Sequence, residues 1–365
     1  MEYLKQALEL AQIGMGHVSP NPMVGAVLVK NERVIGTGFH KKYGQDHAEI
    51  NAIDSATESV EGATLYCTLE PCCHSNKQTP PCVDRIISEK IAHVVVISLD
   101  PNKEVAGGGL KMLEAAGIKV SVDSSLAELE REMNEIYYKY ISTKRPFVHL
   151  KWAQTIDGKI ARVTGDSKWI TCDKSREYVH YLRGMNQSIL VGSTTAVIDN
   201  PSLNIRYGLD KKFPQPLRIV IGGLSKLTTE LNIFKNQDLQ KTIVVTSETN
   251  AEIEGLLTNL GIEVIKISDN SNGYLDLEEL LDFLGERKIS SIFVEGGAKV
   301  LSSFFREGLA DKVSTFIAPK FFGEGIEAIH GLAFSSLKEY YFLDKVKLMT
   351  FRDDILMQGR PIKKS

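Results

Sequence analysis

The chain has 365 residues, of which 43% are hydrophobic and 24% charged, and its formal net charge is −3 at pH 7. This profile is typical of a soluble globular protein long enough for two domains. It offers no basic surplus for binding a polyphosphate backbone, which disfavours a nucleic-acid partner. No apolar run approaches the length of a membrane span, and the polar N-terminal residues do not fit a signal peptide. We therefore expect a cytoplasmic protein.

Helical and extended patterns alternate through the first 140 residues. Apolar side chains at helical spacing predict a helix over residues 2–14. A β-branched apolar run predicts a strand over 23–29 that pairs with 33–39 as a hairpin. This alternation predicts a layered α/β domain. Further helices are expected at 47–56, 82–89, 110–116 and 126–140, and further strands at 64–69, 94–99 and 118–122.

The polar segment 142–146 ends in a proline and separates two such series, so we expect domains at 1–144 and 145–365. The second half repeats the alternation and predicts another α/β domain. Residues 335–358 are expected to close it as a pair of strands with a turn at 353–354. Its other strands are expected at 147–153, 188–191, 217–221, 242–246, 262–267, 291–294 and 312–318, and its helices at 173–184, 251–260, 276–285 and 298–307.

The residues most typical of a chemical site lie in the first half. Four of the five cysteines fall between Cys67 and Cys82, which favours a metal site in a reducing compartment over disulfides. His47, Cys72 and Cys82 can hold one Zn²⁺ and leave a fourth position for water, whose pKa the metal lowers to about 7. Glu49 would carry protons between this water, a substrate ring nitrogen and a leaving amine. Such a His-x-Glu and Pro-Cys pattern is typical of zinc deaminases.

The local context of these residues sharpens the prediction and also leaves an alternative. His47 and Glu49 should project from the first turn of one helix. Cys72 and Cys82 are each expected at a helix start, where unpaired N–H groups favour thiolates. A purely structural zinc site would instead need a fourth protein ligand, which Cys73 or His74 could supply. Cys67 lies in the middle of a predicted strand and is expected in the core.

Several motifs in this half resemble the deaminase domain of the bifunctional deaminase/reductase family of riboflavin biosynthesis. They are His47-Ala-Glu49, Thr68-Leu-Glu-Pro-Cys72, Thr79-Pro-Pro-Cys82, Asn21-Pro-Met-Val-Gly25 and Asp100-Pro-Asn102. The resemblance implies a cytidine-deaminase-like α/β/α layered fold, with Asn21 and Asn102 contacting the substrate. It also places Lys77 near the ribose or phosphate, although a solvated lysine fits the sequence equally well.

The spacing of the two cysteines departs from this family. Cys72 and Cys82 are one residue further apart than the family's ligands, and Cys73 with Cys82 would restore the family spacing. We assign the zinc to Cys72, because Glu70-Pro71 fixes its place directly after a strand. The wide separation favours this family over nucleobase editors, whose two cysteines are about three residues apart.

The second half carries a series of motifs that resemble the reductase half of the same family. That half has a dihydrofolate-reductase-like α/β fold and uses NADPH. No Gly-x-Gly-x-x-Gly follows the first strand, which argues against a Rossmann dinucleotide site. The motifs are Lys151-Trp-Ala153-Gln-Thr-Ile-Asp157-Gly158-Lys159, Ser167-Lys-Trp169, His180-Tyr-Leu-Arg183, Gly192-Ser-Thr-Thr195, Asp199-Asn-Pro201-Ser202-Leu203-Asn-Ile-Arg206 and Glu295-Gly-Gly297.

The residue types in these motifs suit phosphate and dinucleotide binding. Arg183 and Arg206 can hold a substrate phosphate through bidentate hydrogen bonds, and Ser167 and Ser202 add neutral donors. The backbone N–H groups that follow Glu295 could bind the cofactor pyrophosphate. By resemblance, Glu295 contacts the substrate. NADPH contacts are expected by resemblance from Ala153, Trp169, Thr195, Asp199, Gly297, Ala298, Lys299, Val300, Leu301, Ser302 and Ser303.

Ordinary structural explanations exist for several of these residues. Trp169 could be a core residue, Arg183 a charge on a surface helix, and Gly296-Gly297 a helix-entry turn. The group that selects the NADPH 2′-phosphate is not readable from the sequence, and Ser225 and Lys226 are only candidates.

The resemblance implies two consecutive reactions on small phosphoribosyl pyrimidines. The first is zinc-dependent deamination of 2,5-diamino-6-(5-phosphoribosylamino)pyrimidin-4-one, and the second is NADPH-dependent reduction of the ribosyl group. It also implies a homo-oligomer built through the reductase domain. The alternatives are a nucleic-acid deaminase with an accessory domain, and a zinc-stabilised nucleotide-binding regulatory protein without catalysis. A regulatory protein would have no need of Glu49.

Overall fold

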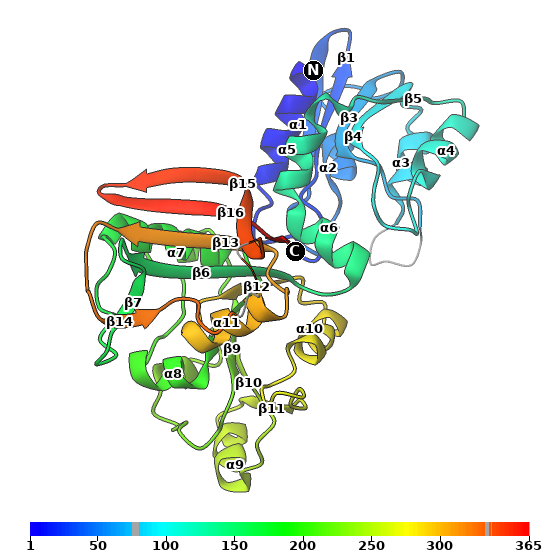
Figure 1. The fold of residues 1–365 in the computed structure, drawn as a ribbon. Coiled ribbons are helices and arrows are strands. Elements are labelled where there is room, and N and C mark those ends of the chain that lie inside the picture. The colour runs from blue at the N-terminus through cyan, green and yellow to red at the C-terminus, as the bar shows by residue number, and fades with distance from the viewer. Residues whose placement is uncertain (75–79, 333–335, 337, 365) are drawn as a thin grey trace. The chain divides into compact units, whose positions relative to one another are not determined.

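The computed structural model describes residues 1–74, 80–332, 336 and 338–364. The chain divides into two compact units, Met1–Lys144 and Arg145–Ser365, and each contains its own large β-sheet (Figure 1). Among the described residues, no helix combines the length and the apolar character that a membrane span needs.

The first unit is a five-stranded sheet with helices on both faces. The strand order is β2-β1-β3-β4-β5, and the sheet is antiparallel at β1 and parallel from β3 to β5. The strands are β1 (Gly25–Lys30), β2 (Arg33–Phe39), β3 (Thr64–Leu69), β4 (His93–Ser98) and β5 (Lys119–Val122). The helices are α1 (Glu2–Gln12), α2 (Ala48–Asp54), α3 (Cys82–Ser88), α4 (Gly108–Ala115), α5 (Ala127–Met133) and α6 (Glu135–Thr143).

Successive side chains of a strand point to opposite faces of this sheet, so each strand contributes to the packing on both faces. Ala26 and Leu28 of β1 pack in the core formed with α2, α3 and α4, whereas Val27 and Val29 pack in a smaller cluster on the face of α1. Burial on both faces explains why β1 reads as a continuous apolar run. Helix α2 lies very close to β2, because a Cβ at Gly38 would be 2.3 Å from the Ala48 carbonyl oxygen.

The single helix predicted over 126–140 is two helices, with a break at Asn134. The Asn134 side chain bonds both backbone groups of Met23, accepting from its N–H at 2.8 Å and donating to its carbonyl at 3.0 Å. Its Nδ2 also donates to Glu130 at 2.9 Å. Helical periodicity alone predicts that the helix continues through Asn134. The side chain of this residue is instead bonded to a distant segment, and α6 begins directly after it.

The second unit is a nine-stranded sheet in the order β11-β10-β9-β8-β12-β6-β13-β16-β15, with a separate β7-β14 pair. It is parallel from β11 to β13 and antiparallel at β16 and β15. The strands are β6 (Phe147–Thr155), β7 (Lys159–Arg162), β8 (Ser188–Gly192), β9 (Leu217–Ile221), β10 (Thr242–Thr246), β11 (Glu263–Lys266), β12 (Ser291–Val294), β13 (Lys312–Ala318), β14 (Gly325–Glu327), β15 (Tyr340–Phe351) and β16 (Asp354–Lys364). The helices are α7 (Asp173–Gly184), α8 (Ser193–Asp199), α9 (Ala251–Asn259), α10 (Leu277–Glu286) and α11 (Ala298–Arg306).

Helices cover the two faces of the parallel part of this sheet. Residues of α10 and α11 pack with one set of strand side chains, and residues of α7, α8 and α9 pack with the other. Because β6, β8 and β12 are parallel neighbours, their carboxyl ends meet at one edge of the sheet. Open α/β sheets bind ligands at such an edge.

The short strands β7 and β14 and the short helix α8 were not predicted, and the closing strand pair extends beyond its predicted end. The hairpin turns at Arg352–Asp353, and β16 continues to Lys364 rather than ending at 358.

Candidate functional sites

In the described part of the chain, one cluster of side chains could hold a metal ion, formed by His47, Cys72 and Cys82. The Nδ1 atom of His47 lies 3.4 Å from each of the two sulfurs, and the sulfurs are 3.3 Å apart. Donor atoms around a tetrahedral zinc would be about 3.5–3.8 Å apart, from Zn–S of about 2.3 Å and Zn–N of about 2.0–2.1 Å. The three atoms therefore fit one face of a zinc tetrahedron and leave its fourth corner for another ligand.

Two helix starts position this cluster. His47 is the N-cap residue of α2, and Glu49 lies in the first turn with only 3% of its surface exposed. Cys82 is the first residue of α3, and its N–H donates to Cys72 Sγ at 3.4 Å. Cys72 itself follows β3 in an irregular segment, so the prediction that it begins a helix is wrong. The backbone N–H that favours its thiolate comes from α3 instead.

Cys73 and His74 lie outside this cluster. The sulfur of Cys73 is 3.9 Å from the Glu104 carbonyl oxygen, and His74 Nδ1 is 3.9 Å from the Glu104 carboxylate. The structure thus brings Cys72, and not Cys73, next to His47, and it places no fourth protein ligand among the described residues. Cys67 is fully buried, as predicted, and burial raises the pKa of its thiol.

A buried carboxylate fixes the segment that carries Cys72. Glu70 accepts hydrogen bonds from the N–H groups of Asp100, Gly107 and Leu110 at 3.3, 2.9 and 3.2 Å. A Cβ at position 109 would lie 2.2 Å from the Pro71 carbonyl oxygen, so only glycine fits there. Glu70-Pro71 therefore does set the place of Cys72, by tying it to the loop after β4.

Asn21 and Asn102 have different surroundings. Asn21 Nδ2 lies 3.2 Å from His40 Nε2, and the buried His40 ring packs edge-on against His47 with centroids 5.0 Å apart. Asn102 lies in the loop that Glu70 holds, and its side chain accepts from the Glu104 N–H at 3.2 Å. Sequence reasoning missed His40, because no motif signalled it. Lys77 lies outside the described residues.

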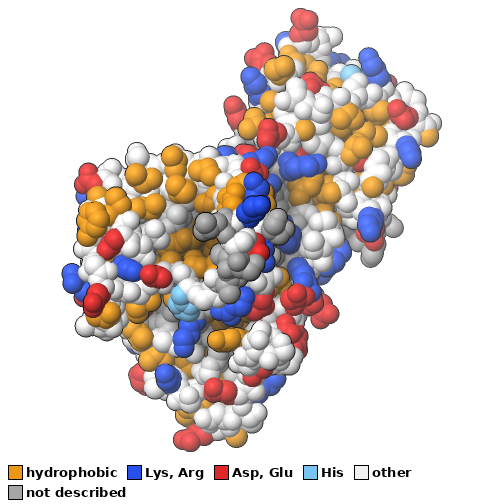
Figure 2. Space-filling model, viewed as in Figure 1, with side chains coloured by type: hydrophobic (Ala, Val, Ile, Leu, Met, Phe, Trp, Pro, Cys, Tyr) orange, Lys and Arg blue, Asp and Glu red, His pale blue; other side chains and the backbone are white. Residues whose placement is uncertain are grey.

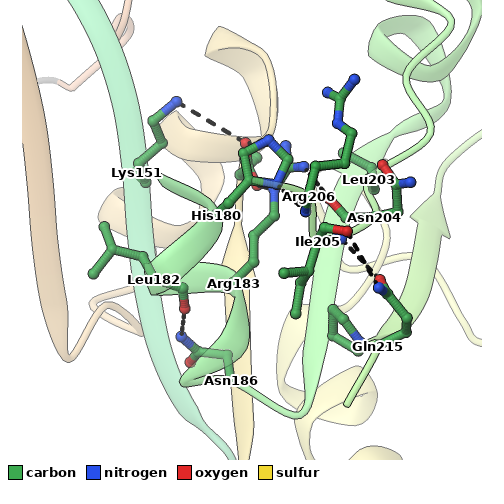
Figure 3. Close-up of polar contacts among 12 residues, drawn as sticks. Lys151, His180, Leu182, Arg183, Asn186, Leu203, Asn204, Ile205, Arg206 and Gln215 are labelled. Atoms are coloured by element: carbon green, nitrogen blue, oxygen red, sulfur yellow. Dashed lines mark hydrogen bonds and ion pairs between the residues drawn. The ribbon is translucent and has the colours of Figure 1, made fainter. Parts of the chain in front are cut away.

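The second unit contains a nearly buried ion cluster where β12 ends beside the middle of β6 (Figure 3). The Arg183 guanidinium donates to both oxygens of Glu295 and, through Nη1, to the Asn204 carbonyl at 2.8 Å. Lys151 Nζ lies 3.9 Å from Glu295 Oε2, and the Lys151, Arg183 and Glu295 side chains are 15%, 11% and 10% exposed. Arg183 is therefore not the surface helix charge that the sequence also allowed.

Electrostatics in this cluster oppose the cost of burial. Burial lowers the pKa of Lys151, and the nearby Glu295 carboxylate partly counteracts this shift. Burial alone would raise the pKa of Glu295, but the charges of Arg183 and Lys151 hold it below its usual value. Sequence reasoning quoted Lys151 within a motif and missed it as a site residue, because its role depends on burial beside Glu295.

Arg206 and the two serines have different surroundings from Arg183. The Arg206 side chain is exposed, and no hydrogen bond or ion pair engages its guanidinium within the described residues. Ser202 precedes it in the same loop, and the Ser167 hydroxyl bonds Asp199. Burial raises the pKa of Asp199, with Lys168 and Ser167 opposing the shift.

The expected cofactor residues gather where β8 and β12 lead into α8 and α11. The Gly297 N–H donates to Thr195 Oγ1 at 3.1 Å. Added Cβ atoms at Gly192 and Gly296 would lie 2.9 and 2.8 Å from Val300, so these glycines let α11 approach the strand ends closely. The side chains of Ala298, Leu301 and Ser302 are buried, whereas those of Lys299, Val300 and Ser303 are exposed or half-buried.

The remaining expected cofactor residues include Trp169 and Ala153, together with the candidate 2′-phosphate residues Ser225 and Lys226. Trp169 is 64% exposed under the Arg176 guanidinium, which lies 4.3 Å from the ring centroid, so the core alternative is wrong. Ala153 is half-buried near the carboxyl end of β6. Ser225 and Lys226 are both exposed after β9.

Comparison with known proteins identifies both units. Residues 1–98 match the cytidine and deoxycytidylate deaminase zinc-binding region, and residues 146–357 match the RibD C-terminal domain. The fold and sites thus define a two-domain enzyme that joins a zinc-binding deaminase to a reductase. The riboflavin biosynthesis protein RibD of Aquifex aeolicus is 41% identical over 355 residues, which cover 97% of this chain and 96% of that protein. RibD of Escherichia coli is 38% identical over 331 residues, or 88% of each protein.

Two solved structures match this chain over nearly its whole length. The Thermotoga maritima diaminohydroxyphosphoribosylaminopyrimidine deaminase/5-amino-6-(5-phosphoribosylamino)uracil reductase gives a TM-score of 0.84 at 37% identity, covering 99% of this chain and 98% of that one. Acinetobacter baumannii RibD gives 0.88 at 32% identity with the same coverage. The chain therefore belongs to the RibD family and is a bifunctional deaminase and reductase of riboflavin biosynthesis. This confirms the expected fold class and the expected pair of activities.

Proposed function

We propose that the first unit hydrolyses the 2-amino group of 2,5-diamino-6-(5-phosphoribosylamino)pyrimidin-4-one and releases ammonia. The second unit then uses NADPH to reduce 5-amino-6-(5-phosphoribosylamino)uracil to the ribitylamino product. The observation that carries the first assignment is the donor set of His47, Cys72 and Cys82 with the buried Glu49 on the same helical turn as His47. The printed activities of the Thermotoga maritima relative support both substrates.

The deaminase chemistry follows from the residues around the cluster. His47, Cys72 and Cys82 would hold a zinc ion, which would lower the pKa of a bound water to about 7. Glu49 accepts a proton from the attacking water, passes it to the adjacent ring nitrogen and later donates a proton to the amine that leaves as ammonia. Asn21, which lies against His40, and Asn102 would orient the pyrimidine, as the family resemblance implies.

The reductase chemistry uses the ion cluster of Lys151, Arg183 and Glu295. Thr195 and the residues at the start of α11 would hold NADPH, which would supply a hydride for C1 of the ribosyl group. As the bond between C1 and the ring oxygen breaks, that oxygen needs a proton. Lys151 is the donor we assign, because its buried ammonium is close to Glu295 and burial lowers its pKa toward the working range. Arg206 binds the substrate phosphate through its exposed guanidinium.

The experiment supplies the diaminopyrimidine phosphate to zinc-loaded protein, with and without NADPH. We expect ammonia release in both cases and NADPH oxidation only after it. Absence of ammonia would refute the deaminase proposal, and failure to oxidise NADPH with the aminouracil phosphate would refute the reductase proposal. Glu49→Gln should keep zinc and reductase activity while ammonia release falls at least about 10²-fold. A nucleotide-binding regulatory protein would show neither activity.

We also propose that the enzyme is a homo-oligomer joined through its second unit. Strand β15 is an edge strand, and the β15–β16 hairpin exposes apolar side chains, visible in orange over this hairpin in Figure 2. Contiguous exposed apolar surface is typical of association sites. Leu348→Glu, at a position 62% exposed, should convert the oligomer to a monomer in light scattering. A wild-type monomer at micromolar concentration would contradict the proposal.

We propose small molecules as the only substrates and the cytoplasm as the location. The net charge of −3 offers no general affinity for nucleic acid, and none of the five cysteines, all of which lie in the described residues, forms a disulfide, which suits a reducing compartment. Incubation with tRNA or single-stranded DNA should yield no ammonia. Fractionation of cells that express the tagged chain tests the location.

A further inference from the structure

Every residue of one surface loop in the second unit has a backbone group bonded to a side chain from another element. This segment, Ser202–Arg206, is called the phosphate loop here, because Arg206 is the proposed phosphate ligand. The carbonyls of Ser202, Leu203 and Asn204 accept from Arg218 at 3.4 Å, Gln240 at 3.1 Å and Arg183 at 2.8 Å. Ile205 is bonded by Gln215, and the Arg206 N–H donates to His180 Nδ1 at 3.1 Å.

Gln215 makes the most specific of these contacts. Its Oε1 accepts from the Ile205 N–H at 2.8 Å and its Nε2 donates to the Ile205 carbonyl at 3.3 Å, so one amide pairs with both backbone groups of one residue (Figure 3). Such a pair fixes the direction of the peptide groups on either side of Ile205. In the described residues no hydrogen bond or ion pair joins its side chain to Lys151 or Glu295, so Gln215 does not contact the ion cluster directly.

The local sequence holds Gln215 in place. It stands between Pro214 and Pro216, directly before β9, and each proline ring restricts its own φ and the residue before it. The Pro216 carbonyl is fixed in turn by Gln240, which donates to it at 2.8 Å. The hydrogen bonds from Gln215 to Ile205 are therefore made by a residue whose backbone is restrained.

The two side chains next to the bonds made by Gln215 have opposite surroundings. Ile205 is 2% exposed and packs inward, whereas the Arg206 side chain is exposed and its guanidinium makes no hydrogen bond or ion pair within the described part of the chain. The Arg206 backbone is held at its N–H by His180, whose acceptor nitrogen fixes the proton on the other ring nitrogen. An arginine on a loop ordered in advance loses less conformational freedom on binding, which increases affinity.

We propose that Gln215 is a positioning residue for phosphate recognition: it holds the Ile205 peptide groups so that the Arg206 guanidinium is directed at the substrate phosphate. This inference rests on the proposed function, because it takes Arg206 as the phosphate ligand. It assigns Gln215 to substrate affinity and not to the hydride or proton transfer.

The test compares Gln215→Leu with the wild type in the reductase reaction. We expect the KM for the phosphorylated aminouracil to rise about tenfold, while kcat and the KM for NADPH stay within about twofold. With the dephosphorylated substrate the variant and the wild type should have similar kinetics. A fall in kcat at unchanged KM, or an equal loss with both substrates, would overturn the proposal.

A matched control is available in the same unit. Gln237 also bonds two backbone groups, donating to the Phe234 carbonyl at 3.1 Å and accepting from the Thr242 N–H at 2.8 Å, but it does not contact the phosphate loop. Gln237→Leu should therefore leave the KM for the phosphorylated substrate unchanged, and an equal rise would show a merely structural effect. If Gln215→Leu does not fold, Gln215→Glu, which keeps the acceptor for the Ile205 N–H, should give a smaller rise in the same KM, and no rise would overturn the proposal.

A double-mutant cycle with Arg206→Ala distinguishes the two ways to fail. If Gln215 acts through Arg206, Gln215→Leu should have no further effect on KM in the Arg206→Ala background. An undiminished effect there would overturn this inference. If Arg206→Ala alone leaves KM unchanged, the proposed role of Arg206 is wrong, and the inference falls with it.

Discussion

The Arg183 guanidinium lies against both carboxylate oxygens of Glu295, with Nε 2.5 Å from Oε1 and Nη2 3.1 Å from Oε2. The two residues are 112 positions apart in the sequence, and Lys151 adds a second cation to the same carboxylate. The negative charge of Glu295 thus balances the positive charges of two nearly buried groups, Arg183 and Lys151. Removal of one partner from such a group leaves an uncompensated buried charge, which is costly.

Glu295→Gln should therefore lower the reductase kcat/KM by about 10²-fold or more, while the deaminase rate stays within about twofold. The amide cannot balance Lys151 and Arg183, so the pKa of Lys151 falls further. Separate assays of ammonia release and NADPH oxidation check this. Glu263→Gln is the matched control, since Glu263 also faces an arginine, Arg287, through two bonds of 2.6 Å but on the surface. Equal losses in the two variants would contradict the assigned role.

Cys73→Ser should retain one zinc per chain and full ammonia release, because the Cys73 sulfur lies toward Glu104 and not in the cluster. Cys72→Ser should lose both, since it removes one of three ligands. Zinc analysis of the purified variants, together with the ammonia assay, separates the two. Zinc loss in the Cys73 variant with retention in the Cys72 variant would reverse the ligand assignment.

Gly38→Ala should reduce both zinc content and stability of the first unit. The new methyl would lie 2.3 Å from the Ala48 carbonyl oxygen and 2.3 Å from the Ala52 nitrogen, and these are backbone atoms of α2, the helix that follows His47 and contains Glu49. Overpacking of this kind typically costs about 1–3 kcal/mol. Thermal unfolding and zinc analysis measure the effects. Gly255→Ala within α9, where nothing lies within 4 Å of the added carbon, should be neutral or slightly stabilising.

Histidine 180 should make the stability of the second unit depend on pH. Burial, with the charges of Arg183 and Arg206, lowers the pKa of His180 to about 4. Between this value and the ordinary value of about 6.5, the unfolded chain binds more protons than the folded one. The free energy of unfolding therefore rises with pH across this window, by up to about 3 kcal/mol from this group.

His180→Asn should remove this contribution, because the amide oxygen can still accept the Arg206 N–H but does not titrate. The difference in unfolding free energy between wild type and variant should grow from pH 4 to pH 6.5 and then stay constant. Urea unfolding at several pH values measures it. Parallel pH profiles for the two proteins would show that His180 does not carry the effect.

Local patterns in the sequence predicted most elements, but not the contacts that depend on distant residues. The helix-start signal Pro-Cys occurs at both Cys72 and Cys82, and only Cys82 begins a helix, because Glu70 ties the earlier segment to the loop after β4. Helical periodicity continued through Asn134, where bonds to Met23 coincide with a break.

Side chains whose role depends on burial were the least predictable. Lys151 was visible in a motif, yet only its position beside Glu295 marks it as a site residue. Gln215 gave one signal that could have been read, its place between two prolines before a strand, but the sequence does not show that it faces Ile205.

The closeness of Val300 to Gly192 and Gly296 bears on attempts to change the specificity of the proposed NADPH site. Because a single methyl group at either glycine would meet the same valine, these three positions form one steric unit shared by two strand ends and a helix. Randomising them one at a time should return mainly the present residues. Libraries that enlarge position 192 or 296 while shrinking position 300 would reach combinations that stepwise selection cannot.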